Sequence, residues 1–305
     1  MSIRPIKRIV QSQPTLEGAG VKLRRAFGFG NTGEFDPFLL LDDFRNEHPE
    51  DYLAGFPWHP HRGIETITYV LSGSVQHGDS LGNRGAMGPG DVQWMTAGSG
   101  ILHQEMPKGD AHGRMHGFQL WANLPKALKM TDPRYQDILA KDIPEVVDDD
   151  GTRVRVICGD FWGKRGPVEG VAAEPRYLDV SVPPGVRKRL PVEASRHAFA
   201  YVFEGAGSFR DASAPRGILT ERVGEGSGDT GTLVRDETGN RSLVLFDSGD
   251  EITVQAGDQG IRFLLVSGRP LEEPVAWQGP IVMNTPDELR RAYAELRDGT
   301  FIKHP

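Results

Sequence analysis

Residues Trp58 to Gly73 read WHPHRGIETITYVLSG, and the rest of the chain is interpreted from this stretch. It places His59 and His61 two residues apart, puts Glu65 four residues further on, and continues in a β-branched and aromatic run that ends at Ser-Gly. Alternate residues of a strand share a face, so we expect all three side chains to point the same way. About forty residues later, His103 and Glu105 form a second pair of this kind.

Two such pairs on facing strands predict a metal site of three imidazoles and one carboxylate inside a β-barrel. A chain of this length with nine histidines contains an i,i+2 histidine pair by chance about one time in four. The pattern is specific because His103 and Glu105 form a second pair with the same spacing. The alternative interpretation is a buried polar cluster in which Glu105 and Arg62 satisfy the imidazoles. The aromatic residues Phe56, Trp58 and Trp94 flank the predicted site and could wall a pocket for a flat ligand.

The composition is typical of a soluble globular protein. The 305 residues are 38% hydrophobic and 25% charged, which suits two domains of ordinary size. A net charge of -7 argues against general nucleic-acid affinity. No apolar run is long enough to predict a membrane helix, and no apolar signal core follows the basic N-terminus. The single cysteine, Cys158, excludes an internal disulfide, so we expect a buried thiol and a reducing cytoplasm.

Short β-branched runs bounded by glycine and proline predict an all-β chain. We expect strands at residues 3–11, 21–27, 38–41, 92–96, 101–105 and 116–125, followed by a polar, partly helical segment at 126–142. The chain should end in a helix, because Thr285, Pro286 and Glu288 form a capping box with proline in the first turn. The apolar stripe of this helix is predicted to pack on the core and consists of Leu289, Ala292, Tyr293 and Leu296.

The second half of the chain repeats the first. Residues 200–205 align with 68–73, and residues 249–259 align with 90–100, with an insertion at about 211–240 between them. On this alignment the ligand positions and Glu65 correspond to Pro191, Glu193, His197, Arg262 and Leu264, so the repeat has lost the ligand set. We predict a metal-binding barrel over residues 1–135, a barrel without ligands over 146–283, and a helix and tail over 284–305.

The remaining histidines are expected to lie outside the site. His112 and His116 have the helical zinc spacing, but glycines follow both and the context is a loop that enters a strand. A structural or solvent-facing role is therefore expected for these two. His48 and His77 lie beside turn residues and are expected to be exposed.

Three segments resemble the pirin family of the cupin superfamily: HPHRG-x-ET-x-TYVLSG at 59–73, PGDVQWMTAGSGILHQE at 89–105, and GPIVMNT at 279–285. The resemblance extends over nearly the whole chain and implies two jelly-roll barrels packed face to face, with iron in the N-terminal one. It implies His59, His61, His103 and Glu105 as the four ligands. The wider cupin pattern would take the carboxylate from Glu65, which in pirins becomes a candidate neighbour of the ligands.

The resemblance also implies a function, quercetin 2,3-dioxygenase activity, in which a flavonol binds the metal through its 3-hydroxyl and Glu105 accepts the proton. Three imidazoles and one carboxylate leave one or two coordination positions open and suit Fe(II), but also Mn, Co, Ni, Cu or Zn. The alternative is an iron-binding regulatory protein, a transcription co-regulator or redox sensor that acts through protein partners. A third interpretation is a structural metal without turnover. We expect a cytoplasmic protein with a small aromatic substrate and no direct binding of membranes or nucleic acids.

Overall fold

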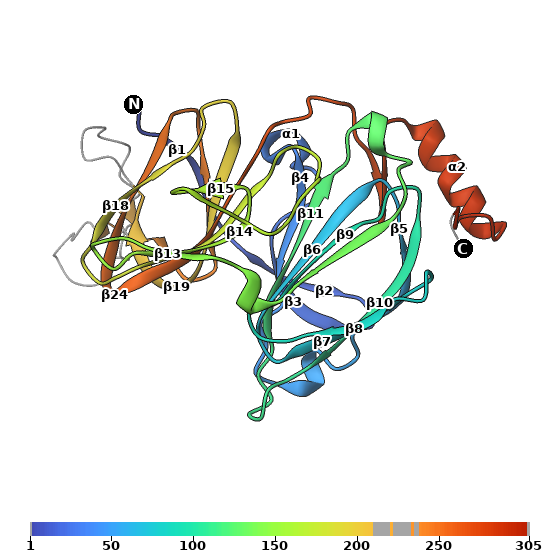
Figure 1. Ribbon diagram of the computed structural model, residues 1–305, viewed down its shortest axis with the longest axis horizontal. Helices are drawn as coiled ribbons and strands as arrows, with labels where there is room; N and C mark the ends of the chain where they lie inside the picture. Colours follow the sequence, from blue (N-terminus) through green and yellow to red (C-terminus); the bar gives the residue numbers. More distant parts are fainter. Residues whose placement is uncertain (1, 210–219, 222–232, 235–237, 304–305) are drawn as a thin grey trace.

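A computed structural model describes residues 2–209, 220–221, 233–234 and 238–303. Two β-barrels lie side by side along the long axis of the molecule, and a C-terminal helix lies at one end (Figure 1). The predicted all-β architecture of two cupin barrels with a C-terminal helix is confirmed. In the described part of the chain, neither helix is long and apolar enough to cross a bilayer.

The N-terminal barrel consists of two antiparallel sheets. The larger contains, in spatial order, β12 (Arg134–Ile138), β9 (Val92–Thr96), β6 (Ile64–Ser72), β11 (His116–Asn123), β4 (Phe38–Asp43), β3 (Val21–Phe27) and β2 (Gln13–Glu17). The smaller contains β5 (Phe56–His61), β10 (Ile101–Lys108), β7 (Ser74–Asp79) and β8 (Arg84–Met87). Burial alternates along β10, where His103 and Glu105 are buried and their neighbours are partly exposed. The period of two therefore turns both of these side chains into the barrel.

Short helical segments connect some of these strands. They are α1 (Thr32–Phe35) and three 3-10 helices at Pro49–Asp51, Lys126–Leu128 and Ala140–Asp142. The segment 126–142, predicted to be polar and partly helical, thus holds two 3-10 turns with strand β12 between them.

The C-terminal barrel is built on one nine-stranded sheet. Its main path runs β1 (Ile6–Gln11), β23 (Ser242–Phe246), β19 (His197–Ser208), β24 (Glu251–Gly268), β17 (Arg176–Val182), β14 (Arg153–Cys158) and β13 (Glu145–Val147). In addition, β18 (Arg187–Pro191) pairs with β24, and β22 (Thr238–Gly239) pairs with β19. Two separate antiparallel pairs are also described: β15 (Asp160–Phe161) with β16 (Lys164–Arg165), and β20 (Thr220–Glu221) with β21 (Leu233–Val234). Most of the predicted insertion at 211–240 lies outside the described residues.

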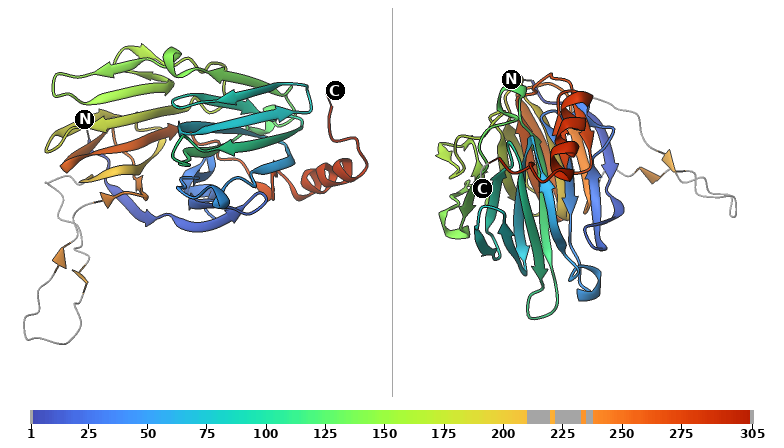
Figure 2. Two further views of the ribbon diagram at one scale, coloured as in Figure 1. Left: turned by 90° about the horizontal axis from the view of Figure 1, so that it is seen from below. Right: turned by 90° about the vertical axis from the view of Figure 1, so that its right-hand side faces the viewer.

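Each end of the chain crosses to the other barrel. Strand β1 pairs with β23 and so belongs to the C-terminal sheet. The hairpin of β25 (Ala276–Gln278) and β26 (Ile281–Met283) packs on the first barrel, where Val282 belongs to one buried apolar cluster with Ile64 and Met95. Helix α2 (Pro286–Arg297) follows it and begins at the predicted capping box. Figure 2 shows the helix at the end of the molecule away from the N-terminus. Residues 6–11 of the predicted range 1–135 therefore belong to the second barrel, and residues 276–283 of the predicted range 146–283 pack on the first.

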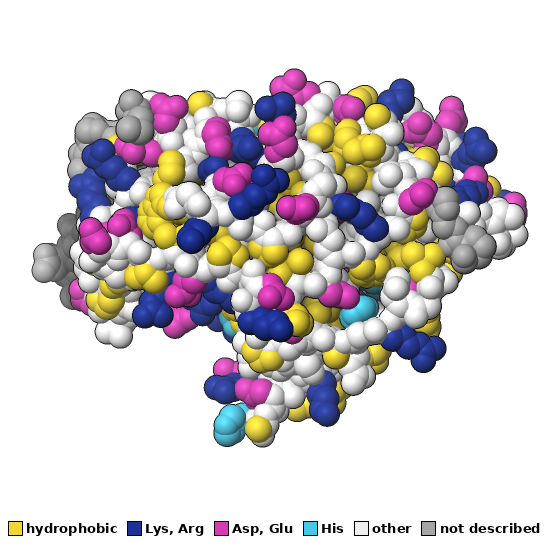
Figure 3. All heavy atoms as spheres, viewed as in Figure 1, with side chains coloured by type: hydrophobic (Ala, Val, Ile, Leu, Met, Phe, Trp, Pro, Cys, Tyr) yellow, Lys and Arg dark blue, Asp and Glu magenta, His cyan; other side chains and the backbone are white. Residues whose placement is uncertain are grey.

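The two large sheets pack against each other through one apolar core. Ile67, Trp94 and Phe118 from the first barrel meet Phe199 and Leu264 from the second. Burial of this shared surface removes apolar area from water and holds the barrels together. On the outer face shown in Figure 3, acidic and basic side chains are intermixed and no broad patch of one sign appears.

Candidate metal centre

The pairing of β5 with β10 brings three histidines together. His103 lies directly opposite His59, and Ile101 lies opposite His61. Directly opposed residues of an antiparallel pair have Cβ atoms about 4.5–5.5 Å apart. One ring nitrogen of each of the three imidazoles lies within 4.8 Å of the others. Among the residues that the structure describes, no other group of three His, Cys, Asp or Glu side chains meets this condition.

Backbone carbonyls determine which ring nitrogens face one another. Nδ1 of His59 donates to the carbonyl of Pro57 at 2.8 Å, and Nδ1 of His61 donates to the carbonyl of Pro280 at 3.2 Å. A carbonyl can only accept, so each Nδ1 carries the proton and each Nε2 carries a lone pair. The two Nε2 atoms are 3.1 Å apart. Two nitrogens bound at about 2.1 Å to one ion, at right angles, would lie about 3 Å apart, so the pair fits a metal.

The third imidazole, that of His103, contacts the other two rings but has no hydrogen-bond partner in the part of the chain that the structure describes. Both ring nitrogens of His103 are buried and make no hydrogen bond within the described residues. Burial lowers the pKa of His103 and of His61 well below the ordinary histidine value, and the neighbouring imidazoles lower both further. The rings are thus neutral, the form in which histidine binds a metal. An unpaired buried polar side chain is costly, and a bound ion would remove that cost.

The carboxylate of Glu105 lies on the same face of β10 as His103 but outside the group of three imidazoles. Its Oε1 is 3.0 Å from the hydroxyl of Thr68, which is itself 2.9 Å from Oε1 of Gln119. Burial raises the pKa of Glu105 to about 7, and the hydrogen bond to Thr68 partly opposes this. The predicted fourth ligand is therefore a buried carboxyl held by the opposite sheet, two residues along the strand from His103.

Glu65 does not join the cluster, contrary to the expectation that it shares a face with His59 and His61. Gly63, with φ of 77°, separates β5 from β6, and the two strands belong to different sheets. The alternation of faces does not continue across such a break. Glu65 instead accepts a hydrogen bond from Thr96 at 2.8 Å and lies outside the cavity beside the imidazoles.

Two further expectations are wrong. Trp94 is fully buried in the core between the barrels and does not line the site, because its face of β9 points to the second barrel. His77, expected to be exposed, is buried opposite Glu105, where its Nε2 lies 2.9 Å from Nε2 of Gln93. Strand β7 turns it inward, which the turn residues around it do not reveal. His48 and His112 are exposed, and Cys158 is buried, as expected.

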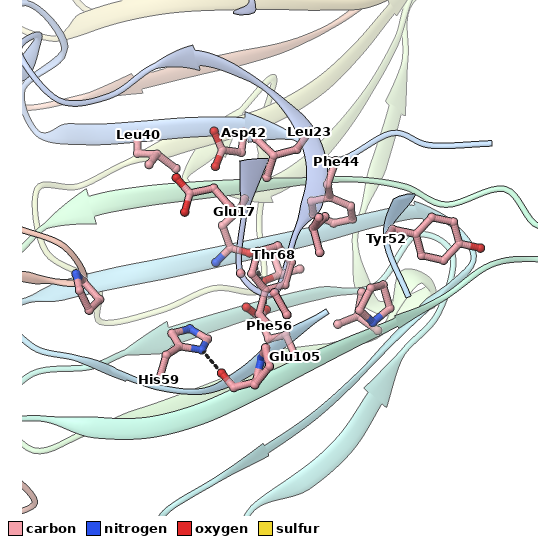
Figure 4. A pocket seen from close by; sticks show the side chains of 18 of the residues that line it. Glu17, Leu23, Leu40, Asp42, Phe44, Tyr52, Phe56, His59, Thr68 and Glu105 are labelled. Atoms are coloured by element: carbon pink, nitrogen blue, oxygen red, sulfur yellow. Dashed lines mark hydrogen bonds between the residues drawn. The ribbon is translucent and has the colours of Figure 1, made fainter. Parts of the chain in front are cut away.

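A cavity of about 490 Å³ adjoins the imidazoles (Figure 4). Its volume lies within the range of about 300–1,000 Å³ that is usual for small-molecule sites. His59, His61, Glu105 and Thr68 line one part of it. Its walls are mainly apolar, and its aromatic side chains are Phe29, Phe44, Tyr52, Phe56, Trp58 and Trp121. The predicted residues Phe56 and Trp58 are in this lining, and Trp121 takes the place expected for Trp94.

The C-terminal segment completes the site. Besides the carbonyl of Pro280, it supplies partners for Arg62, the residue that follows His61. The Arg62 guanidinium donates to Ser99, Glu295 and Phe301 at 2.7–2.8 Å and is 2% exposed. Ser99 is 37 residues from Arg62, but Glu295 and Phe301 are more than two hundred residues away, so sequence alone gives no sign of the contacts with the C-terminal segment.

Comparisons with known proteins agree with this geometry. Residues 20–122 match the Pirin family, and residues 177–302 match the pirin C-terminal cupin domain. The chain belongs to the pirin family. It is 43% identical over 302 residues to a pirin-like protein of Caulobacter vibrioides, with 99% of this chain and 100% of that protein covered. It is 36% identical to pirin of Homo sapiens, with 97% and 93% covered. The crystal structure of quercetin 2,3-dioxygenase from Acinetobacter baumannii has 30% identity and a TM-score of 0.83, over 98% of this chain and 99% of that one.

In this pirin-family chain, the second barrel carries apolar residues at most positions equivalent to the ligands. Leu190 faces Ile252 across β18 and β24, and Lys188 faces Val254, as His61 faces Ile101 and His59 faces His103. By strand pairing, the equivalents of the four predicted ligands are Lys188, Leu190, Val254 and Ala256. The sequence alignment had assigned Pro191, Glu193, Arg262 and Leu264, because its offsets of 132 and 159 residues differ from the 129 (188 − 59) and 151 (254 − 103) that the strand pairing gives. The second barrel lacks a ligand set on either assignment.

Proposed function

We propose that this chain is a metal-dependent dioxygenase of flavonols, with His59, His61, His103 and Glu105 as ligands of a divalent ion, in first place Fe(II). The observation that carries the proposal is the pair of histidine Nε2 atoms, 3.1 Å apart with their tautomers set by backbone carbonyls, beside a mainly apolar cavity. The Acinetobacter baumannii relative named quercetin 2,3-dioxygenase supports the substrate class.

The residues around the cavity suit each part of this reaction. A divalent ion in the site would act as a Lewis acid that favours the deprotonated 3-hydroxyl of a flavonol. Glu105 would accept that proton, and its hydrogen bond to Thr68 orients the carboxylate. The rings of the substrate would lie against Phe44, Phe56 and Trp121, which exclude water from the reacting carbons. Flavonol and O₂ would then give the ring-opened ester and carbon monoxide.

The test measures oxygen uptake and carbon monoxide release with quercetin, using protein reconstituted without air and then exposed to O₂. We expect the two gases to change in equal amounts with the Fe(II) protein. The variant His48→Ala, at an exposed histidine outside the site, should retain this activity, and His61→Ala should fall to the level of free metal. If wild-type protein stays at the level of free metal with Fe, Mn, Co, Ni and Cu, the dioxygenase proposal fails and the regulatory interpretation replaces it.

A further inference from the structure

The cavity has a charged group on the sheet that faces the imidazoles. Arg25 on β3 makes a two-pronged ion pair with Asp42 on β4, from Nε at 2.8 Å and from Nη2 at 2.7 Å. The same Nη2 lies 2.8 Å from Oε1 of Glu17 on β2. All three residues line the cavity, and Figure 4 shows Glu17 and Asp42 across it from His59 and Glu105. We refer to them as the Glu17–Arg25–Asp42 triad.

The triad has hydrogen-bonding capacity left for a ligand. Its internal bonds use Nε and Nη2 of Arg25, both oxygens of Asp42 and one oxygen of Glu17. Within the described residues, this leaves the two N–H groups of Nη1 and the second oxygen of Glu17 without a hydrogen-bond partner, a donor and an acceptor on two side chains that are themselves in contact. The Arg25 side chain is 17% exposed and that of Glu17 is 41% exposed, so a ligand in the cavity can reach both.

The charge of the triad selects among ligands. Two carboxylates against one guanidinium leave a net charge of about -1, which disfavours a carboxylate or phosphate ligand. A phenolic hydroxyl fits both vacant positions, since it can accept from Nη1 of Arg25 and donate to Glu17. Packed sheets lie about 10 Å apart, so a three-ring molecule bound at the imidazoles can extend to the opposite sheet.

We propose that the Glu17–Arg25–Asp42 triad is the specificity-determining subsite of the cavity and binds the hydroxyl groups on the ring of the substrate that is farthest from the imidazoles. This inference rests on the proposed function and adds that the natural substrate is a polyhydroxylated aromatic compound, not an unsubstituted one. Asp42 is a positioning residue in this arrangement, because it holds the guanidinium while Glu17 and Arg25 contact the ligand.

The experiment compares two flavonols that differ at the distal positions. Quercetin carries ring hydroxyls, whereas 3-hydroxyflavone has the same metal-facing oxygens and none beyond them. Dissociation constants are measured calorimetrically, without O₂, for wild-type protein, for Glu17→Met and for the control Glu47→Met at an exposed glutamate outside the cavity. We expect Glu17→Met to weaken quercetin binding about ten-fold, as loss of a hydrogen bond to a charged group does, and to leave 3-hydroxyflavone binding unchanged.

The possible outcomes distinguish failure of the subsite from failure of the proposed function. If Glu17→Met leaves quercetin binding unchanged, or weakens both flavonols equally, the subsite is refuted while the proposed function stands. If the control Glu47→Met weakens quercetin as much as Glu17→Met does, the subsite is also refuted. If wild-type protein binds neither flavonol, the proposed function fails and the subsite fails with it.

Discussion

Replacing Gly63 by alanine tests whether the C-terminal segment supports the metal centre. Gly63 has φ of 77° and lies between the ligand strand β5 and strand β6. A Cβ atom at this position would overlap the carbonyl oxygen of Val282, on β26. The carbonyl belongs to a backbone paired with the first barrel, because the Val282 N–H donates to the carbonyl of Arg62 at 3.1 Å. The clash therefore has to displace the hairpin.

The expected loss of stability is the sum of one backbone-strain contribution and two broken hydrogen bonds. Alanine in the left-handed region costs about 1–2 kcal/mol. Displacement of Val282 also breaks its backbone hydrogen bond, worth about 1 kcal/mol, and the bond from the Lys129 ammonium to its carbonyl, worth about 1.5–3 kcal/mol. Gly63→Ala should thus lower the free energy of unfolding by about 3.5–6 kcal/mol. Because the Pro280 carbonyl that orients His61 is two residues away, metal should also dissociate faster.

The matched control is Gly82→Ala. Gly82 has φ of 86°, but a Cβ there has nothing within 4 Å. This variant bears the left-handed cost alone and should lose only about 1–2 kcal/mol. The assay is urea unfolding of both variants, with metal dissociation followed by competition with a chelator. Equal losses of stability in the two variants, or an unchanged rate of metal dissociation in Gly63→Ala, would refute the reasoning.

Three further predictions concern the site and its support. Wild-type protein should hold about one metal ion per chain by elemental analysis, and His61→Ala close to none, since three ligands hold the ion more weakly than four; two ions per wild-type chain would contradict this. Glu105→Gln should weaken metal retention and abolish turnover while Glu65→Gln retains the metal, and the reverse order would exchange their roles. Burial lowers the pKa of Lys129 from 10.5 to about 7. The unfolded chain then binds more protons than the folded one between these values, so stability should rise with pH by up to about 1.4 kcal/mol per unit. Urea unfolding at pH 7 and 9 should show this rise in wild-type protein and not in Lys129→Met; the same slope in both would argue against it.

Local patterns account for the features that the sequence predicted. The alternation His103-x-Glu105 requires only that residues 101–105 form a strand, and β10 has both side chains buried. The capping box at Thr285 depends on residues within one turn, and the structure shows both of its hydrogen bonds. These predictions succeed because side-chain alternation and helix capping depend only on residues that are close together in the chain.

The expectations that were wrong all depend on which sheet a strand joins, or on which face of a strand meets the cavity. Residues 59–65 look like one continuous strand, yet Gly63 divides them between two sheets and sends Glu65 to the other side. Trp94 lies on one of the two alternating faces of β9. Which of these two faces meets the cavity depends on the packing of the second barrel. Nothing in a strand's own pattern distinguishes a cavity from an interface between barrels, because both bury apolar side chains.

The sequence by itself determined the strand-rich fold, the two histidine-bearing segments and the absence of a matching ligand set in the repeat, since residue type and spacing decide these. Only the tertiary structure decided that β1 pairs with the second barrel and the C-terminal hairpin packs on the first, that the Pro280 carbonyl orients His61, and that Arg25 joins Glu17 and Asp42 on one wall of the cavity. These contacts come from strand register and from segments far apart in the chain. Their energies depend on distance in space, which a sequence pattern does not contain.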